Sequence, residues 1–121
     1  MSGLAEKTCT PCRGGVPPLT AAEAEAYRVQ APEWALRDEA TRIERTYRFG
    51  SFGDAFAFVR GAGELAEAEF HHPDISFGWG YVTISLRTKK IKGLHENDFI
   101  MAVKLDQLAG AMAVADKQVE R

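Results

Sequence analysis

Two adjacent histidines, His71 and His72, are the side chains in this sequence best suited to acid–base chemistry. They follow a predicted helix and precede Pro73, which favours an extended backbone at the residue before it. Glu67 lies four residues before His71, one turn away if the helix persists, so its carboxylate can orient an imidazole. Imidazoles titrate near neutral pH and both give and accept protons. The pattern indicates a proton-transfer site, and the alternative is a helix end whose histidines only favour the helix dipole.

A basic segment and an aromatic turn are candidates for ligand binding. Lys89, Lys90 and Lys92 crowd one short segment, which is either a solvated loop or a cationic rim for an anionic or electron-rich ligand. Trp79 lies in a Gly-x-Gly turn, where its ring either packs in the core or stacks on a flat heterocycle. The sequence contains no glycine-rich phosphate motif, serine triad or Walker lysine.

Cys9 and Cys12 form a single Cys-x-x-Cys motif. A tetrahedral zinc site needs more ligands than this pair, and the histidines lie far from it in the sequence. A redox motif of this spacing usually opens a helix after a strand, whereas this pair precedes a Pro- and Gly-rich stretch. We therefore expect a plain, mobile tail, with zinc binding and redox chemistry as the alternatives.

Composition limits the class of protein. The chain has 121 residues, of which 45% are hydrophobic and 26% charged, the mix of a single globular domain. Its 15 Lys and Arg against 17 Asp and Glu give a net charge of −2, which argues against a nucleic-acid binder. No apolar run approaches the roughly 20 residues of a membrane span, and the first residues lack a signal core. We therefore expect a cytoplasmic protein with no membrane partner and no direct nucleic-acid partner.

Three helices are predicted to position these side chains. The first begins at Thr20, which forms a capping box with Glu23, and ends near residue 30, ahead of Pro32. The second begins after Ser51, a good N-cap, and runs to about residue 69, while the third begins near residue 96. The second and third helices carry apolar stripes, Phe52, Ala55, Phe56, Val59, Ala62 and Ala66 on one and Met101, Leu105, Leu108 and Met112 on the other.

Four short strands are predicted at residues 34–36, 42–49, 75–77 and 81–86. In the second strand, Ile43, Tyr47 and Phe49 point one way and polar residues point the other, with Arg45 as a snorkelling side chain. Hairpin-like turns between short strands predict an antiparallel sheet with the helices on one face, an α+β fold. The predicted domain spans residues 19–114, between a flexible N-terminal tail over 1–18 and a fraying segment over 115–121.

Residues 67–82 read Glu-Ala-Glu-Phe-His-His-Pro-Asp-Ile-Ser-Phe-Gly-Trp-Gly-Tyr-Val, and residues 92–98 read Lys-Gly-Leu-His-Glu-Asn-Asp. Together these runs resemble the pterin-4a-carbinolamine dehydratases, also called 4a-hydroxytetrahydrobiopterin dehydratases. The family pattern is an acidic residue, three intervening residues, His-His-Pro, an aromatic residue, and then a third histidine ahead of Gly-Leu and Asp. The resemblance covers roughly residues 19–110, and the cysteine-containing tail also resembles the start of some bacterial members.

The resemblance implies a four-stranded antiparallel sheet with three helices on one face, assembled as a homodimer or homotetramer. It implies dehydration of 4a-hydroxytetrahydropterin to quinonoid dihydropterin in tetrahydropterin recycling, with no metal and no organic cofactor. Carried over singly, Glu67 matches the acidic position, and His71 and His72 match the histidine pair, so we expect these three residues to be catalytic. Pro73 matches the loop proline, and Asp98 matches the late acidic residue, which caps the third helix or touches the site.

Lys89 is the main departure from the family pattern. It occupies the position of the usual third histidine, and His95 lies six residues later. The family's third histidine is commonly given an acid–base role beside the 4a-hydroxyl. An ammonium group ordinarily titrates near about 10.4, so a lysine suits proton transfer at neutral pH poorly. Lys89 takes over the acid role only if burial or the charges of Lys90 and Lys92 lower its pKa, and otherwise the missing histidine weakens the activity. We therefore expect Lys89, with Pro73, Trp79 and Asp98, to contact the substrate.

Two functions follow from this departure. The first is a dehydratase that relies on His71 and His72. The second is a non-catalytic protein of the same fold, because dehydratase-like proteins also act as RuBisCO assembly factors and as dimerisation partners of transcription factors. The intact group of Glu67, His71, His72 and Pro73 favours the enzyme.

Overall fold

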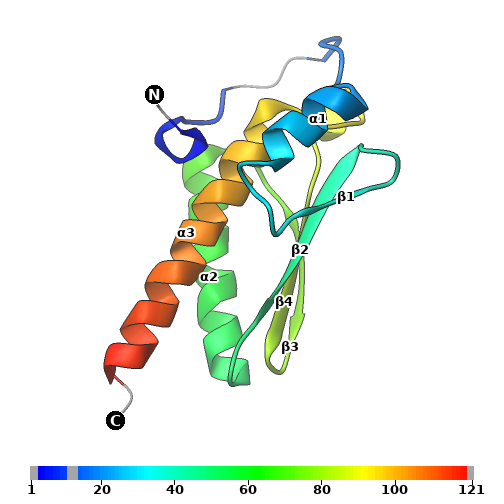
Figure 1. Cartoon of the computed structure of the whole chain (residues 1–121). Coiled ribbons are helices and arrows are strands. Elements are labelled where there is room, and N and C mark those ends of the chain that lie inside the picture. Colours follow the sequence, from blue (N-terminus) through cyan, green and yellow to red (C-terminus); the bar gives the residue numbers. More distant parts are fainter. Residues whose placement is uncertain (1–2, 11–13, 120–121) are drawn as a thin grey trace.

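A four-stranded antiparallel sheet with helices packed against it forms the body of the computed structural model, which describes residues 3–10 and 14–119 (Figure 1). The strands are β1 (Ala35–Arg37), β2 (Arg42–Arg48), β3 (Asp74–Gly78) and β4 (Tyr81–Leu86), in the sheet order β1-β2-β4-β3. The helices are α1 (Ala21–Arg28), α2 (Phe52–Glu69) and α3 (Glu96–Val119), with two short 3-10 helices, η1 (Leu4–Glu6) and η2 (Lys89–Ile91). These elements confirm the predicted α+β fold.

The sheet consists of antiparallel neighbours throughout. β2 lies beside β4 with Thr46 opposite Thr83, and β3 lies beside β4 with Ser76 opposite Thr83. β3 and β1 are the edge strands. β3 and β4 form a tight hairpin at Trp79, and the first residue of β3 follows His72 and Pro73 directly. The histidine pair therefore lies at the end of the hairpin that is opposite its turn.

The predicted caps of the first two helices are confirmed. Thr20 Oγ1 accepts a hydrogen bond from the backbone N–H of Glu23 at 3.1 Å, and Glu23 Oε1 accepts one from the N–H of Thr20 at 2.8 Å. Ser51 Oγ accepts from the N–H of Asp54 at 3.0 Å at the start of α2. Each bond satisfies a helix N–H that has no partner within the helix. The local sequence therefore determines where α1 and α2 begin.

The buried stripe of α2 differs from the predicted one. Phe52 and Phe56 were expected in the core, yet 47% and 55% of their surface is exposed. Phe58 is fully buried instead and continues a stripe with Ala55, Ala62 and Ala66. Phe52 and Phe56 lie to one side of that stripe, where their rings stack against each other with centroids 6.4 Å apart. The prediction was wrong for these two residues because phenylalanines and alanines alternate at the start of α2, which leaves the helical phase ambiguous.

The apolar stripe of α3 is mostly core. Met101 and Leu105 are fully buried with their neighbours Ile100 and Ala102, and Leu108 and Met112 pack against the core. Gly61 lets α2 approach this helix closely, since a Cβ there would lie 3.0 Å from Cδ2 of Leu108. The second and third helices therefore meet directly at this crossing (Figure 1).

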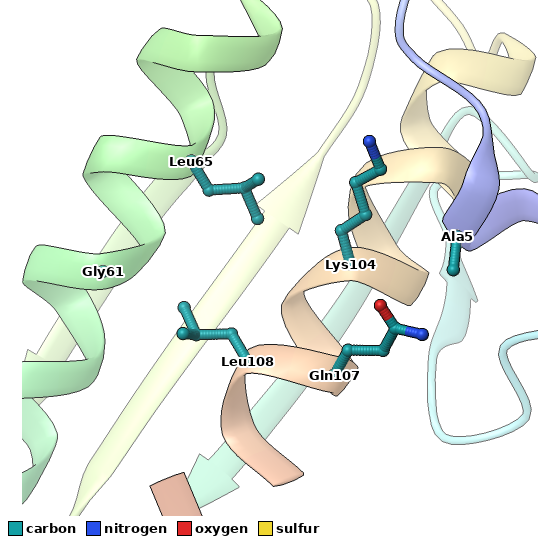
Figure 2. A pocket seen from close by; sticks show the side chains of 6 residues that line it. All are labelled: Ala5, Gly61, Leu65, Lys104, Gln107 and Leu108. Atoms are coloured by element: carbon teal, nitrogen blue, oxygen red, sulfur yellow. The ribbon is translucent and has the colours of Figure 1, made fainter. Parts of the chain in front are cut away.

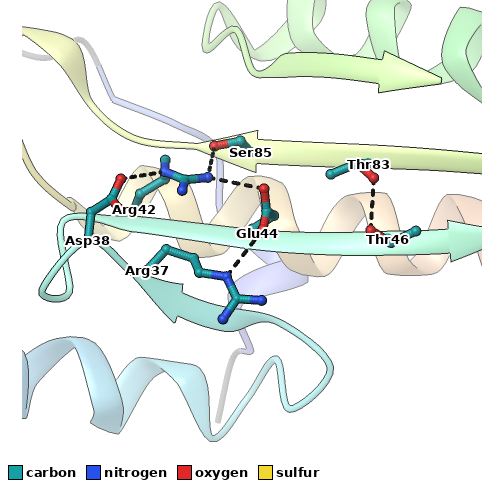
Figure 3. A network of polar contacts seen from close by, with 7 residues as sticks. All are labelled: Arg37, Asp38, Arg42, Glu44, Thr46, Thr83 and Ser85. Atoms are coloured by element: carbon teal, nitrogen blue, oxygen red, sulfur yellow. Dashed lines mark hydrogen bonds and ion pairs between the residues drawn. The ribbon is translucent and has the colours of Figure 1, made fainter.

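The two faces of β2 confirm the predicted alternation. Ile43 and Tyr47 are buried, and Arg45 extends along the ring of Tyr47, 4.3 Å from its centroid, to pair with Asp106 at 2.7 Å. Figure 3 shows the other face, where hydrogen bonds and ion pairs link polar side chains of β1, β2, β4 and the β1–β2 turn. The face that the helices leave open is therefore polar.

Residues 3–10 cross the ends of α2 and α3, and we call them the N-terminal strap. Leu4 is buried in the hydrophobic core, and Lys7 forms an ion pair with Glu96 at 2.5 Å. The expectation of an extended tail did not anticipate these contacts. Cys12 lies outside the described residues. The domain boundaries at 19 and 114, and the fraying of 115–121, stay predictions. Across the described ranges, no helix is both long and apolar enough to cross a bilayer.

Candidate active site

The end of α2 directs the two histidines to different partners. Phe70 ends the helix in the left-handed conformation, with φ 56° and ψ 41°, and the N–H of His71 donates to the Ala66 carbonyl at 3.1 Å. A residue with a side chain is rarely held in this conformation, and the cost is of order 1 kcal/mol or more. The turn sends the imidazole of His71 towards α3 and that of His72 back along α2.

His71 and Asp98 form a largely buried pair. Nε2 of His71 lies 2.7 Å from Oδ1 of Asp98, and the two side chains are 11% and 0% exposed. Oδ2 of Asp98 accepts from the hydroxyl of Thr88 at 2.9 Å and from the backbone N–H of His95 at 3.0 Å. We call His71 and Asp98 the dyad. The Asp98 carboxylate is thus held by groups near both ends of the segment that joins β4 to α3, Thr88 at its start and His95 at its end.

Asp98 both caps α3 and contacts His71. It lies in the first turn of α3 and bonds the N–H of His95, the residue before the helix, as the acidic member of a capping box does. In return, Nδ1 of His95 accepts from the N–H of Asn97 at 3.0 Å. The helix start therefore fixes the carboxylate that holds His71.

The hydrogen bonds of Asp98 determine the tautomer of His71. An ionised carboxylate only accepts hydrogen bonds, so a neutral His71 must carry its proton on Nε2. Its Nδ1 atom is then left with a lone pair and can accept a proton. The same logic operates wherever a buried carboxylate orients a histidine that acts as a base.

His72 pairs with Glu67 at the surface. Nε2 of His72 lies 2.5 Å from Oε2 of Glu67, and more than half of each side chain is exposed. The sequence placed Glu67 one helical turn before His71 if the helix persisted, where its carboxylate could orient an imidazole. The left-handed turn at Phe70 ends the helix first, so the structure brings Glu67 to His72 instead.

The remaining predicted site residues lie at varying distances along the hairpin. Pro73 is half-buried between His72 and β3, next to the dyad in sequence. Lys89 begins η2 directly after Thr88, is 69% exposed at its side chain, and has Nζ 3.8 Å from Oδ1 of Asp74. Trp79 is exposed in the β3–β4 turn, about 15 Å from the start of β3 at the usual rise per strand residue. The fold therefore brings His71, His72, Glu67, Pro73 and Asp98 together, places Lys89 at their edge, and leaves Trp79 at the other end of the hairpin.

Comparison with known proteins identifies the family. The family model "Pterin 4 alpha carbinolamine dehydratase" matches residues 17–108. This chain belongs to that family. The match covers the sheet, α1, α2 and the dyad.

Relatives of this dehydratase family support the assignment along nearly the whole chain. The chain is 60% identical over 109 residues to a protein of Cupriavidus pinatubonensis named "Putative pterin-4-alpha-carbinolamine dehydratase 1", which covers 90% of this chain and 94% of that protein. It is 59% identical over 106 residues to a protein of Methylococcus capsulatus with a name of the same form, covering 88% of this chain and 93% of that protein.

Two solved structures share the dehydratase fold. One, titled "transcriptional coactivator/pterin dehydratase from Brucella Melitensis", has a TM-score of 0.71 and 32% identity over 77% of this chain and 99% of that chain. The other is described as a pterin dehydratase-like protein that is a RuBisCO assembly factor in the alpha-carboxysome. It has a TM-score of 0.57 and 29% identity over 64% of this chain and 90% of that chain.

Thr88 and Asn97 are the site residues that the dehydratase motif did not reveal. Thr88 is buried and bonds Asp98, while Asn97 is buried and bonds the backbone of Thr10. A polar residue beside the third-histidine position, and a second one beside Asp98, were the only signals in the sequence. Threonine and asparagine are common on protein surfaces, so the sequence alone does not indicate that Thr88 and Asn97 are buried.

Cys9 does not have the chemistry of a redox cysteine. Burial first, and then the Glu69 carboxylate, raise the pKa of its thiol to about 12, whereas redox cysteines have a lowered pKa. Cys9 is a free thiol whose Sγ lies 3.7 Å from the carbonyl oxygen of Asn97. Within the part of the chain that the structure describes, no group of three His, Cys, Asp or Glu side chains is arranged to hold a metal ion.

Proposed function

We propose that this protein is a hydro-lyase that converts a 4a-hydroxytetrahydropterin to the quinonoid dihydropterin and water. The observation that carries the proposal is the His71–Asp98 dyad, in which a buried carboxylate holds one imidazole beside a second, exposed imidazole. Membership of the dehydratase family supports the substrate class.

The reaction needs two proton transfers. The bond between C4a and its hydroxyl breaks as that oxygen is protonated, and the hydroxyl leaves as water. The proton on N5 is removed, and its electron pair forms the C4a–N5 double bond. One group must therefore give a proton while another accepts one, both near neutral pH, which suits a pair of imidazoles.

The geometry suggests which imidazole has which role. His71 is the base in this proposal, because its Nε2 bond to Asp98 leaves the lone pair on Nδ1. His72 is the acid, since its exposed ring exchanges protons with solvent and shares one with Glu67. Lys89 is assigned to substrate contact rather than proton transfer, because its side chain is mostly solvent-exposed.

A dehydratase assay tests the proposal. Purified full-length protein is mixed with 4a-hydroxytetrahydropterin generated by an aromatic amino acid hydroxylase, and formation of the quinonoid product is followed by absorbance. We expect turnover by the wild type and a loss of about 10²-fold in His71→Ala, the usual scale for a general base. Arg37→Ala, on the open face of the sheet (Figure 3), is the control and should keep full turnover. A wild type that does not exceed the uncatalysed rate would overturn the proposal.

The second candidate function is a non-catalytic assembly factor. It is favoured by the likeness to the RuBisCO assembly factor and by Lys89 at the third-histidine position. This function would be supported if the wild-type protein proved inactive in the dehydratase assay and bound RuBisCO large subunits. The intact dyad and the His72–Glu67 pair favour the enzyme, because an assembly factor does not need them.

We also propose that the protein forms a homodimer or homotetramer. Most of the α3 stripe is used in the core of one chain, so the sheet edge at β3 is the better candidate for the contact. Exposed edge strands tend to pair, and Phe52 and Phe56 add apolar surface next to β3 through their contacts with Phe77. A monomer at micromolar concentration by light scattering would contradict this.

A further inference from the structure

The N-terminal strap is bonded to the two helix ends that carry the dyad. At the end of α2, the N–H of Cys9 donates to Oε1 of Glu69 at 2.8 Å. Glu69 is the last residue of α2 and lies two residues before His71. The strap is therefore bonded to the side chain of the helix's last residue, two positions before His71.

The other bonds of the strap reach the start of α3. The N–H of Thr10 donates to Oδ1 of Asn97 at 3.0 Å, and Nδ2 of Asn97 donates to the carbonyl of Thr10 at 2.6 Å. Asn97 immediately precedes Asp98 and is 1% exposed. A buried amide is costly without partners, so the strap accounts for this polar side chain in the core.

Direct packing leaves part of the space between α2 and α3 open beside the strap. A cleft of about 340 Å³ lies between the two helices and the strap, lined by Ala5, Gly61, Leu65, Lys104, Gln107 and Leu108. Figure 2 shows Leu65 and Leu108 pointing into this space from the two helices, with Ala5 of the strap at its edge. Apolar side chains of the core and the Gly61–Leu108 contact join the helices elsewhere, and the ion pair of Lys104 with Glu69 at 2.5 Å adds a polar link between them.

We propose that the N-terminal strap positions the dyad, with Asn97 and Glu69 as its positioning residues. The strap bonds one residue beside Asp98 and another close before His71, so it sets the spacing between the two halves of the dyad. Its consequence for turnover rests on the proposed function. Its consequence for the imidazole of His71 is independent of any substrate.

The first test is Asn97→Leu in the full-length chain. Leucine has a similar volume but cannot bond Thr10, so the strap loses both of its hydrogen bonds to the Asn97 side chain. Ring ¹⁵N spectra of the ligand-free protein report the tautomer of His71, assigned by the signal lost in His71→Ala. We expect the wild type to show the Nε2–H form, and the variant to show a mixture of both tautomers. With substrate, we expect kcat to fall by between about 10-fold and about 100-fold, because a displacement of about 1 Å can cost that much.

A matched pair at Glu69 provides the second test. Glu69→Gln and Glu69→Ala both lose the charge that pairs with Lys104, but glutamine still accepts the Cys9 N–H. We expect Glu69→Gln to keep the wild-type His71 spectrum and Glu69→Ala to change it. Ser51→Ala, which weakens α2 at its far end, controls for loss of helix stability and should leave the spectrum unchanged.

The outcomes separate this proposal from the proposed function. An inactive wild type whose His71 tautomer shifts in Asn97→Leu would overturn the dehydratase function and support the strap. An active wild type whose His71 spectrum and kcat are unchanged in Asn97→Leu would overturn the strap. If Asn97→Leu does not fold, the Glu69 pair decides, and identical His71 spectra in both Glu69 variants would also overturn it.

Discussion

Nε2 of His71 lies 2.7 Å from Oδ1 of Asp98, although the two residues are 27 positions apart in the chain. The contact joins the end of α2 to the start of α3 across the segment that contains the β3–β4 hairpin. Asp98 is fully buried and takes part in the cap of its own helix. Its position is therefore set by the fold and does not depend on a bound ligand.

Asp98→Asn should abolish most of the activity without unfolding the protein. The new amide group can donate, so it would place a donor against Nε2 of His71 or lose the Thr88 hydroxyl bond. We expect kcat to fall by about 10²-fold or more, in line with the loss of a correctly oriented base. Turnover is measured by product absorbance, and near-ultraviolet circular dichroism checks the fold. Wild-type turnover in this variant would show that the dyad is not catalytic.

His72→Ala and Glu67→Gln should distinguish the proposed acid, His72, from the residue that only orients it, Glu67. His72→Ala is expected to lower kcat by about 10²-fold, because it removes the proposed acid. Glu67→Gln should cost less than about tenfold, since glutamine keeps a hydrogen-bonding group beside the imidazole. Both side chains are largely exposed, so the free energy of unfolding in urea should change by less than about 1 kcal/mol. Full turnover in His72→Ala would exclude it as the acid.

Lys89 should behave as a substrate contact and not as a catalyst. Its side chain is exposed and its nearest carboxylate, that of Asp74, is 3.8 Å away. We expect Lys89→Ala to change kcat by less than about threefold, with any effect appearing in KM as lost binding. Lys89→His introduces the third histidine that the family resemblance implies at this position, and should keep or raise kcat. A fall in kcat of more than about tenfold in Lys89→Ala, with KM unchanged, would make Lys89 catalytic.

The fold was predictable where the sequence has local rules. Capping residues determine the starts of α1 and α2, and alternation determines which side of β2 faces the core. The prediction for the buried stripe of α2 was wrong at Phe52 and Phe56 because apolar residues lie on more than one face of this helix. Local rules thus define the elements better than they define which residues fill the core.

The site was predictable as a set of residues but not as a set of pairs. The motif indicated Glu67, His71, His72 and Asp98, and the fold brings all of them together. The sequence did not specify which imidazole Glu67 would orient, because that depends on the left-handed turn at Phe70, where a glycine would be the usual residue. The strap was missed because its bonds join backbone groups to Asn97 across 87 residues, and backbone groups leave no pattern in a sequence.

Gly61 and Gly63 in α2 should respond differently to alanine. Alanine is the better helix former by about 1 kcal/mol, and a Cβ at Gly63 would meet no atom within 4 Å. Gly63→Ala should therefore raise the free energy of unfolding by about 0.5–1 kcal/mol. At Gly61 the Cβ would lie 3.0 Å from Leu108, so the gain should be smaller or negative. Urea unfolding of both variants checks this, and equal gains would show that α2 and α3 do not pack closely there.

The pH dependence of stability should reveal the bonds of Glu69. Burial acts to raise the pKa of this carboxyl, but the N–H of Cys9 and the ammonium of Lys104 together hold the pKa below its ordinary value. A carboxyl whose pKa is lower in the folded state stabilises the protein fully above its unfolded pKa, about 4.3 for Glu. That stabilisation is lost as the pH falls through the lower pKa of the folded state.

Glu69→Gln should therefore be less stable than the wild type at pH 6, and the difference should shrink below about pH 4. Glutamine cannot ionise, so it lacks the part of the stability that depends on the charge. Urea unfolding between pH 6 and about pH 3 measures the difference. Glu64→Gln, at a largely exposed residue paired with Arg60 at 3.5 Å, is the control and should track the wild type to within about 0.5 kcal/mol. A difference between Glu69→Gln and the wild type that stays constant with pH would show that the Glu69 carboxylate is not held by Cys9 and Lys104 as a charge.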